Sequence, residues 1–233
     1  IFDYNQHICI SFELLKSDLY EKLKKNKFTP FDINTVKKYS KQILLGLEAL
    51  ISLDIIHCDL KPENIMVTNN DNIKIIDLGS CYIVKKKRLI TNTYIQSRYY
   101  RSPEVILGCD YSFGIDIWSF GCIVFEMLTG KPLFQVRSQN EILSKIVKLI
   151  GFPTQKMILD GSKSHSFFII NEGSVQFKTL TEHENVKPLS NSFEKLYKTE
   201  DIALHDFLKK IINWDYLDRP HPSILLCHEF ISN

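Results

Sequence analysis

The segment from Asp116 to Thr129 is apolar on almost every face of the helix that its sequence predicts. Its apolar residues are Ile117, Trp118, Phe120, Ile123, Val124, Phe125, Met127 and Leu128. A helix without a polar face has to be enclosed by the rest of the chain, because an open side would leave apolar surface in water. Gly130 follows directly, and glycine at this position commonly ends a helix. The sequence therefore predicts a domain organised around one buried helix.

A long amphipathic helix and a hairpin are predicted N-terminal to this segment. Asp32 is a good N-cap, and apolar residues recur at helical spacing after it until the helix should end before Ile55. Further on, the apolar runs 65–67 and 73–76 flank the polar residues 69–72. Two such runs around a polar turn indicate a pair of antiparallel strands.

The remaining elements are predicted mainly as helices. We expect a strand over 7–12, a short helix near Leu19, and a helix that begins at the capping box 138–141 and reaches residue 150. Two further helices are expected over 202–212 and 223–230. Residues 152–200 carry few periodic signals, so this region is expected to be an irregular surface insert.

Composition excludes several classes of function. The chain has 233 residues, 44% of them hydrophobic, which is enough to bury a sizeable core. With 29 basic and 27 acidic residues its formal charge is +2, so neither nucleic acid nor a membrane surface is an expected partner. The six cysteines are scattered, which favours an intracellular location, cytoplasmic or nuclear. The basic tract 85–88 is either a solvated loop or a nuclear-targeting signal. The oligomeric state is not predicted.

The strongest chemical signal is the sequence HCDLKPEN at residues 57–64, between the long helix and the hairpin. Phosphoryl transfer to a hydroxyl needs a base that orients the acceptor, a cation that compensates the moving charge, and ligands for a metal ion. Asp59 is the candidate base and Lys61 the candidate cation. Asn64 offers the oxygen ligand that Mg²⁺ prefers. One carboxylate, one ammonium and one amide thus occur within six residues.

A second carboxylate follows the hairpin, in the sequence Asp77-Leu78-Gly79. Asp77 comes 13 residues after Asn64 and is expected to lie close to it, as a second metal ligand. The sequence SPE at residues 102–104 begins 23 residues after Gly79, a spacing that suits an activation segment.

Each of these residues has a simpler interpretation when it is taken alone. An isolated D-x-G is usually a turn, so Asp77 could serve the backbone only. His57 is interpreted as a packed structural histidine and Cys58 as a small buried hydrophobe. The joint occurrence of the motifs, in order and at workable spacings, favours the chemical interpretation.

With these motifs, the chain resembles the eukaryotic protein kinases, and among them most closely the dual-specificity tyrosine-regulated kinases. The matching segments are FELL at 12–15, HCDLKPEN at 57–64, YIQSRYYRSPE at 94–104 and GFPTQK at 151–156. The resemblance implies an α+β, protein kinase-like fold that consists mainly of the helical C-terminal lobe. It divides the chain into a remnant of the N-terminal lobe (1–12), a hinge (13–17) and the C-terminal lobe (18–233), with a catalytic loop (57–64), an activation segment (77–104) and the irregular insert (152–200). The homeodomain-interacting kinases share several of these motifs.

The resemblance also implies an ATP site, with Mg²⁺ as the metal. Phe12 would be the gatekeeper, while Glu13 and Leu15 would offer backbone groups to adenine. Two acidic residues, Asp18 and Glu63, would lie near the ribose. Met66 and Ile76 would line the floor of the pocket. Each apolar residue of this set has an ordinary core role as its alternative.

The same resemblance implies roles for residues of the activation segment and for residues that pack against it. Ser97 would bond Asp59 and Lys61, which implies protein substrates with Ser or Thr acceptors. Tyr94 matches the family's self-phosphorylated tyrosine, and Arg98 and Arg101 would pair with its phosphate. The alternative for Tyr94 is a packing aromatic. Glu104 and Arg219 would form a buried ion pair, and Asp116 would brace the backbone of the catalytic loop.

The chain departs from the family where the N-terminal lobe should be. No glycine-rich loop, no strand lysine and no partner glutamate precede Phe12. A nucleotide would then lack its cover and an ammonium on its phosphates, so these 233 residues are expected to be inactive in isolation. The leading hypothesis is a protein kinase that is active in its full-length form. The second hypothesis is a non-catalytic interaction module or scaffold. A small-molecule kinase of similar fold is the third.

Overall fold

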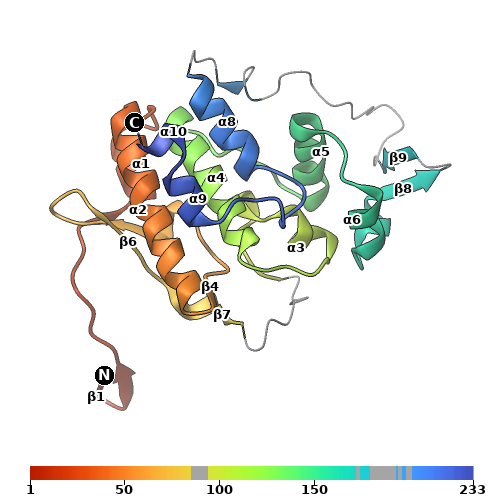
Figure 1. Cartoon of the computed structure of the whole chain (residues 1–233). Coiled ribbons are helices and arrows are strands. Elements are labelled where there is room, and N and C mark those ends of the chain that lie inside the picture. Colours follow the sequence, from red (N-terminus) through yellow and green to blue (C-terminus); the bar gives the residue numbers. More distant parts are fainter. Residues whose placement is uncertain (85–93, 172–173, 179–192, 194–195, 198–200, 233) are drawn as a thin grey trace.

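A computed structural model describes residues 1–84, 94–171, 174–178, 193, 196–197 and 201–232. The basic tract 85–88 therefore lies outside the described residues. The core is formed by α4 (Gly114–Thr129), in which Gly114 to Leu128 are all buried. Helices α2 (Ile33–Ser52) and α8 (Ile202–Ile211) pack on it (Figure 1). Helix α5 (Gln139–Ile150) contributes its buried residues to the same core. The prediction of one enclosed central helix is confirmed.

Gly130 ends α4 at a position where no other residue fits. Its φ is +71°, in the left-handed region that glycine tolerates. A Cβ atom at this position would lie 1.8 Å from the carbonyl oxygen of Phe28. The glycine therefore allows the loop after α1 (Leu19–Lys25) to pack directly on the end of the central helix.

Three antiparallel strands lie beside α2. In sheet order they are β3 (Ser17–Asp18), β5 (Ile65–Val67) and β6 (Ile73–Ile75). The β5–β6 hairpin is the predicted one, and its turn is held by Asp71. The Asp71 carboxylate accepts hydrogen bonds from Lys22 at 2.6 Å, from Lys38 at 3.0 Å and from the Tyr39 hydroxyl. These bonds tie the turn to α1 and α2.

The N-terminal residues project away from this body. Strands β1 (Phe2–Tyr4) and β2 (His7–Cys9) pair with each other, and an extended segment connects them to the helical part (Figure 1). The predicted strand over 7–12 is too long, because β2 ends at Cys9. Nothing among the described residues covers it, and Ile8 is 78% exposed.

The predicted irregular insert contains regular structure in its described part. Helix α6 (Gln155–Asp160) is followed by the 3₁₀ turn η4 (Ser164–Ser166) and a hairpin of β8 (Phe168–Asn171) and β9 (Ser174–Phe177). The rings of Phe168 and Phe177 pack edge to face 5.3 Å apart, and Phe168 also contacts Trp214. Cross-strand aromatic contacts of this kind stabilise a short hairpin. The irregular assignment is therefore wrong for these residues.

The predicted helix over 223–230 is two helices. They are α9 (Pro222–Leu226) and α10 (Glu229–Ser232). His228 interrupts the periodicity, because its Nδ1 accepts a hydrogen bond from the amide of Phe230 at 3.2 Å and so caps the second helix.

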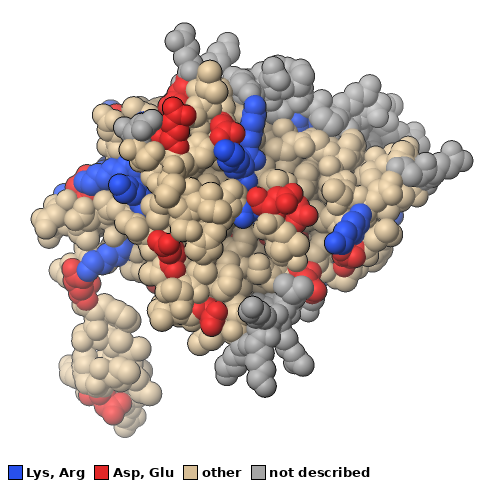
Figure 2. Space-filling view, in the orientation of Figure 1, with Lys and Arg blue, Asp and Glu red and all other residues tan. Residues whose placement is uncertain are grey.

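The catalytic-loop and activation-segment regions contain the remaining short elements. They are β4 (Ile55–Ile56), η1 (Pro62–Asn64), η2 (Leu78–Ser80), β7 (Tyr82–Ile83), η3 (Arg98–Tyr100) and α3 (Pro103–Leu107). Basic and acidic side chains are interspersed on the face shown in Figure 2. None of the helices in the described part of the chain has the length and apolar character that crossing a membrane requires.

Candidate active site

The loop that carries HCDLKPEN is hydrogen-bonded to the first turn of the central helix α4. The Asp116 carboxylate accepts hydrogen bonds from the amides of His57, at 2.7 Å, and Cys58, at 3.1 Å. Burial raises the pKa of Asp116, and the two amides oppose this by stabilising its ionised form. Cys58 has a φ of +65°, a strained conformation for a side chain with a Cβ. Asp116 thus holds the loop in a conformation that the loop would not adopt alone.

His57 is fully buried and has both ring nitrogens engaged. Its Nε2 lies 2.8 Å from the carbonyl oxygen of Ile76, and its Nδ1 accepts from the amide of Asp59 at 3.2 Å. The second bond makes Nδ1 the acceptor, so Nε2 carries the proton. The histidine therefore joins the loop to the end of the hairpin and has no nitrogen left for a reacting group.

Asp59, Lys61 and Ser97 form one hydrogen-bonded cluster. The Ser97 hydroxyl and amide donate to Asp59 Oδ1 at 2.8 and 2.9 Å. The ammonium of Lys61 lies 2.6 Å from Asp59 Oδ2 and 3.2 Å from the Ser97 hydroxyl. The carboxylate side chain is 17% exposed and the lysine side chain 22%. The cluster is thus fixed in position and still accessible from solvent.

The residues proposed as metal ligands are brought together through the hairpin. The amide of Ile76 donates to the carbonyl of Asn64 at 3.0 Å, so Asp77 directly follows a residue that is bonded to Asn64. The side-chain nitrogen of Asn64 donates to the Asp59 carbonyl at 2.9 Å, which leaves its side-chain oxygen for another partner. Asp77 is exposed, in a left-handed conformation at φ +64°. Its carboxylate also accepts a hydrogen bond from the amide of Gly79 at 3.3 Å. This bond is the one expected if Asp77 serves only to stabilise a turn, the alternative considered from the sequence.

These oxygen donors suit a hard cation such as Mg²⁺. In the described ranges no three His, Cys, Asp or Glu side chains are grouped in a way that could hold a metal ion. An aspartate and an asparagine would need further oxygen ligands, from nucleotide phosphates and water, to complete the octahedral coordination of Mg²⁺.

The activation segment brings one of the two predicted arginines to Tyr94. The guanidinium of Arg101 lies 6.0 Å from the centroid of the Tyr94 ring and donates to the carbonyl of Gln96 at 2.7 Å. Arg98 instead donates to the carbonyl of Arg137 at 2.8 Å. The Tyr94 side chain is 90% exposed. Residues 85–93 of this segment lie outside the described part.

Gln96 was not singled out from the sequence and connects three parts of the site. Its amide donates to the carbonyl of Cys58 at 2.9 Å, and its side-chain nitrogen donates to Ser119 of α4 at 2.9 Å. Its side-chain oxygen accepts from the amide and the hydroxyl of Ser102, both at 3.0 Å. Gln96 lies in the family-matching segment 94–104, but the sequence assigns its side chain no role, because that role depends on burial.

A second pair that the sequence did not indicate joins the same segment to α4. The hydroxyl of Tyr100 donates to the carboxylate of Glu126 at 2.7 Å, and both side chains are buried. Burial raises the pKa of Glu126 to about 7, although the bond from Tyr100 opposes this change.

The Glu104 and Arg219 side chains form a bidentate ion pair with distances of 2.7 and 2.8 Å, and both are 0% exposed. Arg219 also donates to the carbonyls of Asn213, Gly114 and Trp214. The pair therefore links α3, at the end of the activation segment, to the start of α4 and to the loop after α8.

The residues proposed to surround adenine and ribose differ in their exposure and in their partners. Phe12 is 84% exposed, and Glu13, also exposed, forms an ion pair with Lys74 of the hairpin. Leu15, Met66 and Ile76 are half-buried, and Glu63 is exposed. Asp18 lies opposite Met66 in the sheet and caps α1 by accepting from Glu21 at 2.7 Å. Of these residues, Asp18 and Met66 are neighbours in the sheet.

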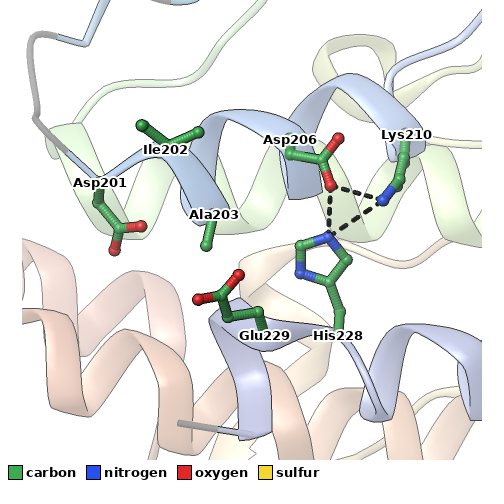
Figure 3. A pocket seen from close by; sticks show the side chains of 7 residues that line it. All are labelled: Asp201, Ile202, Ala203, Asp206, Lys210, His228 and Glu229. Carbon is green, nitrogen blue, oxygen red and sulfur yellow. Dashed lines mark hydrogen bonds and ion pairs between the residues drawn. The ribbon is translucent and has the colours of Figure 1, made fainter.

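A separate concavity of about 700 Å³ between α8 and α10 contains none of these residues (Figure 3). Within it, the Asp206 carboxylate contacts Lys210 at 2.5 Å and His228 at 2.8 Å. The cluster joins two helices and lies outside the proposed site.

The sequence of the chain is similar to those of known protein kinases. A model of the protein kinase domain matches residues 1–231, and the chain belongs to that family. It is 41% identical over 251 residues to Dual specificity tyrosine-phosphorylation-regulated kinase 3 of Rattus norvegicus, covering 99% of this chain and 42% of the relative. It is 38% identical over 231 residues to Dual specificity tyrosine-phosphorylation-regulated kinase 2 of Drosophila melanogaster (98% and 31%). For Serine/threonine-protein kinase ppk5 of Schizosaccharomyces pombe the identity is 39% over 232 residues (99% and 27%).

The chain therefore spans less than half the length of these relatives. The expected kinase-like α+β fold and the resemblance to the dual-specificity tyrosine-regulated kinases are confirmed. Members of the protein kinase family use ATP as the phosphoryl donor together with Mg²⁺.

Proposed function

We propose that the protein transfers the γ-phosphoryl group of ATP to Ser and Thr hydroxyls of protein substrates. The observation that carries this proposal is the cluster of Asp59, Lys61 and Ser97. Asp59 is held on both carboxylate oxygens, so its orientation is fixed before a substrate arrives. An acceptor hydroxyl at its open side would donate its proton to Asp59. Lys61 would stay beside the transferred group and stabilise its negative charge.

Asn64 and Asp77 would hold Mg²⁺, which compensates the charge of the nucleotide phosphates when it is bound. Residues 13–17 would serve as the hinge between a remnant N-terminal lobe (1–12) and the C-terminal lobe (18–233). Phe12, Glu13 and Leu15 would contact adenine there, and Asp18, Glu63, Met66 and Ile76 would complete the nucleotide site from below. The oxygen donors and the half-buried apolar floor support this assignment.

Phosphorylation of Tyr94 in the same protein is a further part of the proposal. The ring is exposed and Arg101 already lies over it, so a phosphate on the hydroxyl would meet a cation. Arg98 would have to leave the carbonyl of Arg137 to take part. Mass spectrometry of active protein would test this, and active protein without phosphate on Tyr94 would contradict it.

The 233-residue chain alone is proposed to have little activity. Its residues 1–16 form an exposed hairpin and a connecting segment, and neither covers a nucleotide. Without groups above the phosphates, much of the charge stabilisation in the transition state is missing. The comparison is a kinase assay of this chain beside the natural full-length protein, and equal turnover by the two would contradict the proposal.

A non-catalytic scaffold is the second candidate, favoured by the exposed N-terminal residues. The two candidates are separated by a kinase assay on the natural full-length protein, wild type beside Asp59→Asn. Asp206→Asn is the matched control, because it removes a carboxylate that lies outside the site. An active enzyme should lose about 10²- to 10⁴-fold in turnover with Asp59→Asn and nothing with the control. Absence of activity in the wild type would favour the scaffold.

A further inference from the structure

A second concavity lies on the C-terminal side of the activation segment, and we call it the insert groove. It is lined by residues from 108–110, 154–162 and 215–217 and has a volume of about 810 Å³. One wall is the turn after α3, the opposite wall is α6, and the third side is the loop before Arg219. Helix α6 lies beside α3 in Figure 1. None of the residues of the proposed phosphoryl-transfer site lines it.

The two main walls are bonded to each other through backbone groups. The amides of Ser162 and Lys163 donate to the carbonyls of Gly108 and Leu107 at 3.1 and 2.8 Å. The Ser162 hydroxyl also donates to the Gly108 carbonyl, at 3.0 Å. At Gly161 a Cβ atom would lie 2.8 Å from the carbonyl oxygen of Leu107, which is too close for a side chain. The groove is therefore preformed, and a ligand would not have to order it.

Three carboxylates converge on the groove. Burial raises the pKa of the Cys109 thiol to about 12, and the charges of Glu104, Asp160 and Asp110 add to this effect. Burial also raises the pKa of Tyr216, together with Asp110, Glu104 and Asp215. Both Cys109 and Tyr216 line the groove, and the Asp110 carboxylate contributes to both pKa shifts. Because its lining holds Asp110, Asp160 and Asp215 against Lys156, its formal charge is −3 + 1 = −2, whereas the whole chain carries +2.

The groove also offers apolar surface beside these charges. Leu217 is 70% exposed, and Met157 is half-buried in the opposite wall. A preformed concavity that combines negative charge with exposed apolar surface suits a ligand with both a cationic and an apolar group. A nucleic acid would be repelled by the carboxylates. A bare metal ion is not favoured either, because the described residues contain no group of three His, Cys, Asp or Glu side chains that could hold one.

We propose that the insert groove binds a short segment of a partner protein in which lysine or arginine alternates with apolar residues. The cationic side chains would meet Asp110 and Asp160, and an apolar side chain would cover Leu217. Binding here needs no phosphoryl transfer, so it goes beyond the proposed function and can fail or succeed independently of it.

The probe is a fluorescein-labelled nonapeptide, Gly-Ser-Leu-Lys-Leu-Arg-Leu-Ser-Gly, titrated with the full chain and followed by fluorescence anisotropy. A control peptide carries Glu and Asp in place of Lys and Arg. The basic peptide should bind with a Kd below about 100 μM, and more weakly as salt is raised. Asp110→Asn combined with Asp160→Asn should weaken binding at least about tenfold.

Four further measurements locate the binding and separate it from catalysis. Glu229→Gln combined with Asp206→Asn removes the same number of charges at the concavity between α8 and α10 and should leave the Kd within about twofold. Leu217→Ser should weaken binding through lost apolar contact and serves as a second test if the aspartate variant is unstable. Amide resonances of 154–162 and 215–217 should shift on titration. Asp59→Asn should bind the peptide like wild type.

Equal binding of the acidic peptide would overturn the proposal. So would an unchanged Kd in both the aspartate and the Leu217 variants, or resonance shifts confined to other surfaces.

Discussion

Replacing Arg219 with alanine tests what holds the end of the activation segment. The substitution removes five hydrogen bonds, two of them to Glu104, and leaves that carboxylate fully buried without its cation. It also removes the guanidinium from the ring of Trp118, whose centroid lies 5.0 Å away. Breaking a buried ion pair by deleting one partner costs about 3 to 5 kcal/mol. For a domain of this size each kcal/mol lowers Tm by about 2 to 4 °C.

The expected result for Arg219→Ala is therefore a Tm about 6 to 20 °C below wild type, measured by circular dichroism. The double variant Glu104→Gln with Arg219→Met is the matched control, because it removes both charges and should recover much of the loss. The reasoning would be refuted if Arg219→Ala changed Tm by less than about 2 °C, since the buried carboxylate would then need no partner.

Three further predictions concern other contacts. Glu126→Gln should become more stable relative to wild type by about 2 to 3 kcal/mol between pH 5 and pH 8 in urea titrations. The reason is that the pKa of Glu126 is higher in the folded protein than in the unfolded chain, so wild type loses stability as pH rises from the unfolded-state pKa toward 7. A stability difference between variant and wild type that does not change with pH would contradict this. Gly130→Ala should destabilise the fold by more than about 2 kcal/mol, because its Cβ would clash with the Phe28 carbonyl, and a wild-type Tm would contradict this. Asp71→Asn should cost about 1 kcal/mol at pH 7, a modest value for a half-exposed cluster. The pKa of Asp71 is lowered by its bond from Lys22, so wild type loses this advantage as pH falls below about 4, and the cost of the variant should shrink there.

The parts of the fold that could be predicted are those that a local pattern determines. The apolar run of α4 leaves no face for solvent, and the Asp32 side chain accepts from the amide of Thr35 at 2.9 Å, as expected of an N-cap. The capping box opens α5 in the same way, with Ser138 accepting from Glu141. These signals depend only on residues within a few positions of each other.

The errors come from side-chain contacts that the spacing of apolar residues does not reveal. The hairpin β8–β9 is stabilised by Phe168 against Phe177 and Trp214, which no local pattern predicts. The break between α9 and α10 depends on a histidine that caps a helix with its ring.

The same distinction applies to the site. The motif residues Asp59, Lys61 and Ser97 could be named because they are recognisable in sequence. Gln96 and Glu126 could not be named, because their importance comes from partners that only the folded chain brings near.

The most direct test of the account is phosphate transfer by the natural full-length protein to a Ser-containing protein substrate, measured with wild type and Asp59→Asn under identical ATP and Mg²⁺. The account predicts measurable transfer by wild type and a loss of about 10²-fold or more in the variant, with an unchanged Tm. Equal transfer by the two proteins would show that Asp59 is not the base and would contradict the proposed mechanism.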